Sequence, residues 1–157
     1  LFGMNSIPLV ELENLTTTLY GPKQDKSITE YANHLAESYT NNFNSFEELI
    51  NFFIQTNNQH TQFWLLDLLV HIAENNYKVF PNETKDKFRN AIIYLFENFI
   101  SKLTHLTFIS NKFGLLFITW IKHDFPENWP NAFKDLLNYI FNTSDENLKM
   151  KKISKNY

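Results

Sequence analysis

The stretch FWLLDLLVHIA, residues 63–73, is apolar on nearly every side of the helix that its pattern predicts. Asp67 and His71 are its two polar residues. A second stretch, ISNKFGLLFITWI at residues 109–121, is nearly as apolar. A helix without a polar face must be covered by neighbours on several sides. These two segments therefore predict helices at the centre of the molecule, with the other segments packed around them.

The segments around these two are apolar on one face only. Residues 28–39, 46–54, 88–103 and 129–141 repeat apolar side chains at helical spacing, and only three glycines and five prolines interrupt the chain. Such one-sided helices are expected to form the outer cover of a helical protein. The sequence predicts helices over residues 9–20, 26–41, 45–56, 60–75, 83–104, 106–123 and 127–143.

The order of these helices predicts an all-α fold built from repeats. Helix starts near residues 45, 83 and 127 recur at roughly 40 residues, the period of HEAT repeats. One-sided and all-round apolar helices alternate from residue 45 onward, as expected for antiparallel helix pairs stacked into a solenoid. A compact globular bundle is the alternative that the pattern alone leaves open.

Composition narrows the class of protein. The 157 residues are 43% hydrophobic and 17% aromatic, which is enough apolar material to fold one domain. A formal charge of −3 lacks the basic character of a nucleic-acid-binding domain. The chain has no cysteine, so it can form no disulfide and no cysteine metal site. No apolar run is long enough to span a bilayer, and we expect no membrane insertion.

Several local patterns predict details of the fold. Ser45 followed by Glu48 is typical of a capping box at a helix start. Gly114, inside an apolar helix, predicts a close approach of two helices. In DFPENWPNAFKDLL, residues 124–137, we expect Pro130 in the first turn of the last helix. Trp129 is expected to be a buried corner between two helix pairs, from which one apolar stripe continues through Phe133.

The search for a catalytic or metal site gives no candidate. The five histidines lack the spacing of a helical metal site, and three scattered glycines form no phosphate loop. For His71 we expect a local hydrogen bond to Asp67, four residues earlier. Asp124 and Glu127 are expected at helix N-termini or links, where the helix dipole favours a carboxylate. We therefore expect no enzyme and no cofactor, and rank a helical enzyme or cofactor-binding bundle last.

Two longer stretches together resemble a known family. QFWLLDLLVHIAENNYKVFPNETKDKFRNAIIYLF, residues 62–96 with the polar pair Arg89 and Asn90, resembles the second and third HEAT repeats of nuclear export receptors. These receptors belong to the importin-β (karyopherin) superfamily. TFISNKFGLLFITWIKHDFPENWPNAFKDLL, residues 107–137, resembles the start of the exportin-1-like region, which we assign to residues 105–143. The matching positions are Phe108, Ile109, Asn111, Lys112, Phe125, Pro126, Trp129, Pro130 and Phe133, whereas Ser110 stands where a basic residue is usual.

The resemblance implies a function without chemistry. Residues 1–157 would be one N-terminal HEAT-repeat region, a piece of a longer solenoid that binds RanGTP on its concave side. The whole receptor would carry cargo from nucleus to cytoplasm through the nuclear pore, contacting nucleoporins. The nearest subfamily, exportin-T, implies tRNA as the cargo. Two alternatives stay open: another exportin with protein or small-RNA cargo, and a HEAT-like interaction scaffold with no transport role.

The resemblance also suggests where Ran would bind. Polar side chains on the inner helices 26–41, 60–75 and 106–123 are the candidates for this contact. For each one alone, an ordinary surface position or a bond between repeats explains the residue equally well. The candidates are Glu37, His71, Glu74, Asn75, Asn111 and Lys112.

Overall fold

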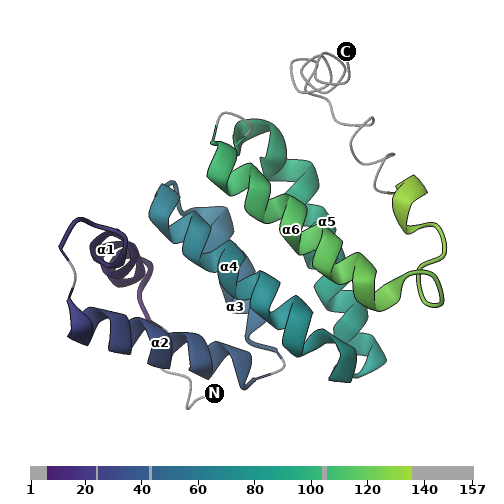
Figure 1. The fold of residues 1–157 in the computed structure, drawn as a ribbon, viewed down its shortest axis with the longest axis horizontal. Helices are drawn as coiled ribbons and strands as arrows, with labels where there is room; N and C mark the ends of the chain where they lie inside the picture. Colours follow the sequence, from purple (N-terminus) through teal and green to yellow (C-terminus); the bar gives the residue numbers. More distant parts are fainter. Residues whose placement is uncertain (1–6, 24, 43, 104–105, 136–157) are drawn as a thin grey trace.

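The fold is all-α, as the sequence predicts. A computed structural model describes residues 7–23, 25–42, 44–103 and 106–135, and no strand occurs within these ranges. Each predicted helix up to residue 123 is present, with ends shifted by one residue at most (Figure 1). The elements are α1 (Leu9–Leu19), α2 (Lys26–Thr40), α3 (Phe46–Gln55), α4 (Gln59–Asn75), the short 3-10 helix η1 (Tyr77–Val79), α5 (Asn82–Leu103) and α6 (Thr107–Asp124).

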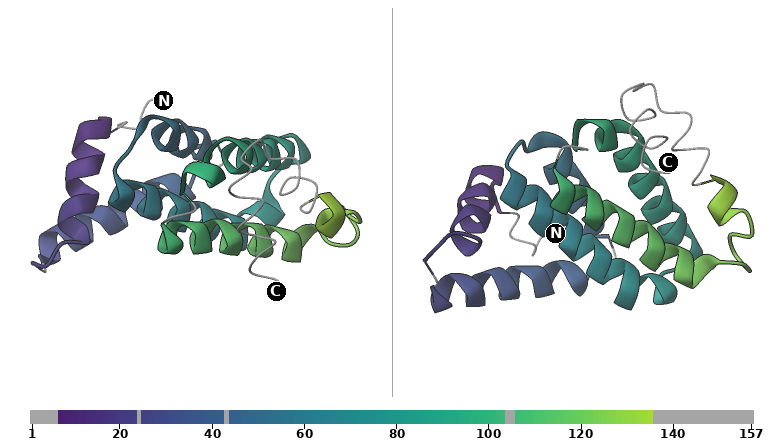
Figure 2. Two further views of the ribbon diagram at one scale, coloured as in Figure 1. Left: turned by 90° about the horizontal axis from the view of Figure 1, so that it is seen from above. Right: turned by 45° about the horizontal axis from the view of Figure 1, so that its top comes forward.

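The helices stack in two layers, in the manner of a helical-repeat protein. Helix α3 pairs with α4, and α5 pairs with α6, each pair antiparallel. Figure 2 shows α3 beside α5 in one layer, with α4 beside α6 in the other. Helix α2 continues the second layer next to α4, and α1 closes the end against α2 and α4. The prediction of stacked antiparallel helix pairs is therefore confirmed.

Helix α4 lies at the centre of this arrangement. It packs against α1, α2, α3, α6 and η1, and its most extensive contact is with α6. Leu65, Leu66 and Leu69 have no exposed surface. The hydroxyl groups of Thr16 on α1 and Thr61 on α4 share a buried hydrogen bond of 2.8 Å. The apolar character of this segment therefore corresponds to cover by neighbours on several sides.

Aromatic side chains join the two layers and the two helix pairs. Phe46 of α3 meets Phe88 of α5 edge to face, with 5.2 Å between ring centres. Phe53 of α3 meets Phe113 of α6 in the same geometry at 5.7 Å. Edge-to-face pairs add about 0.5–1.5 kcal/mol to the free energy gained from burial alone. The dense aromatic positions of the sequence are therefore used for core packing.

The predicted capping box at Ser45 does not form. The Ser45 hydroxyl donates to the backbone carbonyls of Tyr39 and Asn42, the latter at 2.8 Å, and makes no bond to the start of α3. The backbone N–H of Glu48 bonds to the Ser45 carbonyl instead of its side chain. Ser45 is buried and in a helical backbone conformation, so its hydroxyl faces the end of α2.

Helix α6 ends at the predicted proline signal. Asp124 is its last residue, and Phe125 is extended, as the residue before Pro126 must be. The peptide bond between Phe125 and Pro126 is cis. The backbone N–H groups of Asn128 and Trp129 both donate to the Asp124 carbonyl at 2.9 Å. These two hydrogen bonds to one carbonyl oxygen close a turn after α6.

The helix predicted over residues 127–143 is wrong at its start. The Asp124 carbonyl holds residues up to Trp129 in the turn, so helical bonding begins only with Asp135 N–H to the Asn131 carbonyl, at 2.8 Å. Pro130 consequently precedes the helix instead of lying in its first turn. Residues 136–143 lie outside the described residues.

Trp129 forms the predicted corner. Its ring stacks on Trp120 of α6, with 4.3 Å between ring centres, and its Nε1–H donates to the Asp135 carboxylate at 2.7 Å. The side chain is half-buried, not fully buried. The apolar stripe expected to continue from it fails at Phe133, which is 56% exposed and meets the exposed Phe125 edge to face, with 5.1 Å between ring centres.

Replacing Trp129 with Ala tests this corner. We expect the free energy of unfolding to fall by about 2–3 kcal/mol, less than the roughly 3–5 kcal/mol that loss of a fully buried aromatic costs. Urea denaturation gives the value. Phe133→Ala in the same corner is the matched control, with an expected loss of about 1 kcal/mol or less. Equal losses for the two variants would contradict the stacked-corner interpretation.

The expected role of Gly114 is wrong. A Cβ added to Gly114 would meet no atom of the described residues within 4 Å, so no helix among them approaches it closely. The residue lies on the exposed face of α6, where the helix gains nothing from the missing side chain. Gly21 is different, because its Cβ would lie 3.1 Å from the carbonyl oxygen of Thr17.

Gly114→Ala should therefore stabilise the protein by about 0.5–1 kcal/mol, the helix-propensity difference between the two residues. Thermal unfolding followed by circular dichroism would show a higher midpoint. Gly21→Ala is the control, and no gain is expected there because the methyl group crowds a backbone oxygen. A lower midpoint for Gly114→Ala would show that a helix does pack at this position.

Candidate functional site

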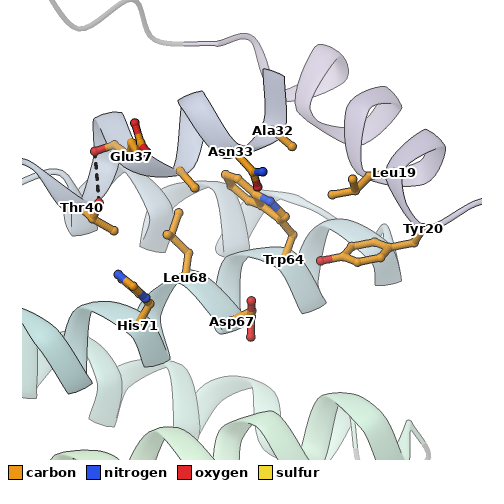
Figure 3. A pocket seen from close by; sticks show the side chains of 11 residues that line it. Leu19, Tyr20, Ala32, Asn33, Glu37, Thr40, Trp64, Asp67, Leu68 and His71 are labelled. Carbon is orange, nitrogen blue, oxygen red and sulfur yellow. Dashed lines mark hydrogen bonds between the residues drawn. The ribbon is translucent and has the colours of Figure 1, made fainter. Parts of the chain in front are cut away.

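A groove of about 430 Å³ separates α2 from α4 (Figure 3). Side chains of α2 and α4 form its long walls, and Leu19 and Tyr20 at the end of α1 close one end. Trp64 lies in the middle of the view, and the Tyr20 hydroxyl points into the space between Trp64 and Asp67. Glu37 and His71 lie toward the opposite end.

The groove exists because α2 presents small side chains to α4. Ala32 and Ala36, one turn apart on α2, line the groove together with the larger Trp64 and Leu68 of α4. Helices whose contact residues are small can pack closely, but α2 meets α4 much less extensively than α6 does. The space that larger side chains would fill therefore stays open to solvent.

Acidic groups give the groove its charge. Glu37 of α2 and Asp67 of α4 line it, together with His71, and no lysine or arginine is among its lining residues. The ammonium group of Lys112 on α6 contacts Asp67 Oδ1 from outside, while the Asp67 side chain stays 55% exposed. Burial, with a smaller contribution from the Asp67 charge, raises the pKa of Tyr20 to about 12. The Asp67 carboxylate therefore pairs with Lys112 of α6 and also contributes to the raised pKa of Tyr20.

The partner expected for His71 is wrong. Asp67 bonds to Lys112 instead, and the His71 ring meets the Asn75 amide, with 3.3 Å between Nδ2 and Nδ1. The same amide donates to the His71 backbone carbonyl at 3.1 Å. The Asp67 carboxylate instead forms an ion pair with the positively charged ammonium group of Lys112 on the neighbouring helix.

The structure brings some of the candidate Ran-binding residues together. Glu37 and His71 line the groove, and Asn75 joins them through its bond to His71. Glu74 is exposed on the last turn of α4, outside the groove lining. Asn111 is exposed on α6 and also lies outside it. All the candidates are on α2, α4 and α6, the three helices of one layer.

Lys112 is the candidate whose role is clearest. Besides its ion pair with Asp67, its ammonium lies 5.1 Å from the centre of the Phe63 ring. Both partners belong to α4, so Lys112 ties α6 to α4 across the repeats. The bond between repeats that the sequence left open for this residue is therefore present.

The residues of the family-like signature divide between core and surface. Ile109 is fully buried, whereas Phe108 is exposed and reaches Phe63 with 5.9 Å between ring centres. Trp129 is half-buried at the corner. The other exposed members are Phe125, Pro126, Pro130 and Phe133.

A buried polar cluster is the feature that sequence reasoning missed. The Asp124 carboxylate is 1% exposed and accepts hydrogen bonds from the Tyr77 hydroxyl at 2.6 Å and from Trp120 Nε1–H at 2.7 Å. The guanidinium of Arg89 lies 3.7 Å from the same carboxylate oxygen. Side chains from η1, α5 and α6 therefore converge on one buried carboxylate.

The expectation for Asp124 is wrong. It lies at the C-terminal end of α6, where the helix dipole disfavours a carboxylate, rather than at an N-terminus. Two donors and Arg89 compensate for this position. Glu127 is exposed in the following turn. The spacing of Trp120 and Asp124, four residues apart, hinted at a pair, but the contact with Tyr77 spans 47 residues and has no local signal.

The described part of the chain offers neither a metal site nor a membrane span. Within it, no group of histidine, aspartate and glutamate side chains is arranged to hold a metal ion. No helix there is long and apolar enough to cross a membrane.

Comparison with known proteins adds no relative. No model of a protein family matches the chain, and none of the curated proteins matches it either.

Replacing Tyr77 with Phe tests the polar cluster. Burial, and then the hydrogen bond to Asp124, raise the pKa of Tyr77 above 10.0, its ordinary value. Its contribution to stability is therefore complete below pH 10 and is lost as the pH rises above it. Tyr77→Phe should cost about 1–3 kcal/mol at pH 7 through the lost bond to a charged group.

The variant should also lose stability less steeply than the wild type above pH 10. Urea denaturation at pH 7 and at several values from pH 9 to 11 measures both effects. Tyr94→Phe, on the exposed side of α5, is the control and should leave both unchanged. An alkaline profile for Tyr77→Phe identical to that of the wild type would remove Tyr77 from this explanation.

Proposed function

We propose that this chain is the N-terminal, RanGTP-binding part of a nuclear export receptor. The supporting observation is that α2, α4 and α6, which carry all six candidate contact residues, form one layer of a helical-repeat fold. A partner lying on this layer would meet side chains from three successive repeats at once. A helical array adds contact area with each repeat, so binding needs no enclosed pocket.

The wider proposal follows from the sequence resemblance. The whole receptor would hold RanGTP and cargo together, with tRNA as the cargo that the nearest subfamily implies. It would contact nucleoporins and shuttle between nucleus and cytoplasm. RanGTP and cargo would each raise the receptor's affinity for the other, because linked binding is reciprocal.

One observation favours a second candidate, an interaction scaffold with no transport role. Lys112 belongs to the family-like motif, yet it is engaged with Asp67 and Phe63 inside the chain. Its place in the motif is therefore explained by tying two repeats together. Such a scaffold would bind its protein partner regardless of the nucleotide on Ran.

Nucleotide-dependent binding separates the two candidates. The full chain is immobilised, and its dissociation constants for Ran loaded with a non-hydrolysable GTP analogue and with GDP are measured by biolayer interferometry. A nuclear export receptor should bind the GTP form at least about tenfold more tightly. Equal affinities would favour the scaffold, and the absence of any binding to either form would refute the Ran proposal.

A pair of variants locates the contact. His71→Ala combined with Glu74→Ala, on the exposed face of α4, should weaken binding of the GTP form about tenfold or more. Glu97→Ala combined with Asn98→Ala, exposed on α5 in the other layer, is the control and should change it less than twofold. Reversed results would place the partner on the α3–α5 layer.

A further inference from the structure

We propose that the groove between α2 and α4 binds an arginine-bearing segment of the partner protein. The inference rests on the proposed function, since the groove lies in the layer assigned to RanGTP, and it specifies the chemistry of that contact. The groove has depth, acidic charge and one exposed aromatic ring, that of Tyr20, which is 38% exposed. Each of these features selects for the same kind of side chain.

Charge complementarity gives the sign of the occupant. Glu37 and Asp67 both line the groove, and none of its lining residues is a lysine or an arginine. Lys112 contacts one oxygen of Asp67 from the α6 side, and the exposed remainder of that carboxylate accepts a second donor. The occupant is therefore cationic.

Aromatic surface favours arginine over lysine. The Tyr20 ring is 38% exposed and lines the groove together with Asp67, whereas Trp64 beside them is only 6% exposed. A planar guanidinium stacks on aromatic rings while it donates to a carboxylate, which a compact ammonium group does less well. Glu37, toward the other end, suits a second arginine on the same segment.

The shape of the groove sets its capacity. Ala32 and Ala36 have small side chains, so α2 fills little of the groove. The open volume of about 430 Å³ has room for side chains of a bound segment. A larger apolar side chain in place of either alanine would exclude the occupant without altering any charge. The steric and electrostatic parts of the proposal can therefore be tested separately.

A hexa-arginine peptide is the probe, titrated into the full chain by isothermal titration calorimetry at 150 mM salt. Glu37→Gln should weaken its binding about fivefold, through loss of one charge-assisted contact. Ala36→Leu should weaken it by a similar factor or more. Glu97→Gln, exposed on α5, makes the same change in net charge and should have less than a twofold effect. Hexa-lysine should bind more weakly than hexa-arginine, and hexa-glutamate should not bind.

The outcomes distinguish this proposal from the function on which it rests. Equal weakening by Glu37→Gln and Glu97→Gln would mean a diffuse charge effect and would overturn the groove proposal, as would unchanged binding in Ala36→Leu. If Ala36→Leu lowers the thermal midpoint strongly, the comparison of the two glutamine variants decides alone. RanGTP binding is measured on the same proteins. RanGTP binding that persists while the peptide fails to distinguish the variants refutes only the groove. A selective groove without RanGTP binding refutes only the transport function.

Discussion

The structure depends on the burial of α4. Leu65, Leu66 and Leu69 have no exposed surface, and each fully buried leucine contributes about 1.5–3 kcal/mol. No single neighbour can cover a helix that is apolar all round, so α1, α2, α3 and α6 must converge on it. The two-layer stack follows from this requirement. The groove follows as well, because α2 covers its share of α4 with Ala32 and Ala36 and leaves that side incompletely filled.

The carboxylate of Asp124 imposes a second constraint, on orientation. A buried charge is costly unless it is paired, and here Tyr77, Trp120 and Arg89 converge on it from three elements. If any of these elements shifted, the charge would lose a partner. The cluster therefore fixes how η1 and α5 meet the end of α6. The backbone carbonyl of the same residue sets the turn that places Trp129 against Trp120.

Sequence periodicity was sufficient for the helices but not for what connects them. The starts of α2 through α6 fall within one residue of prediction because apolar spacing is a local signal. The failures involve groups whose partners are distant or unspecific in sequence. Asp124 meets Tyr77 across 47 residues, and the turn it holds displaced the predicted start at residue 127. Gly114 was expected to mark a close contact between helices, but it lies on the exposed face of α6. The sequence alone does not distinguish a glycine at a helix contact from a glycine on an exposed helix face.

The candidate site shows the same division between local and distant signals. Glu37 and His71 became candidates because the family resemblance points to polar side chains on the inner helices, and both line the groove. Asp67 was assigned to His71 on spacing, but its carboxylate pairs with the ammonium group of Lys112 on the next helix. That pairing holds α4 against α6, whereas α2 is joined to the end of α4 by a hydrogen bond from Asn76 Nδ2–H to the Thr40 carbonyl, at 2.8 Å. A partner resting on this layer would meet the closely packed α4 and α6 and the groove beside α2. The surface of α4 and α6 would supply contact area, and the groove would supply selectivity for the bound side chain.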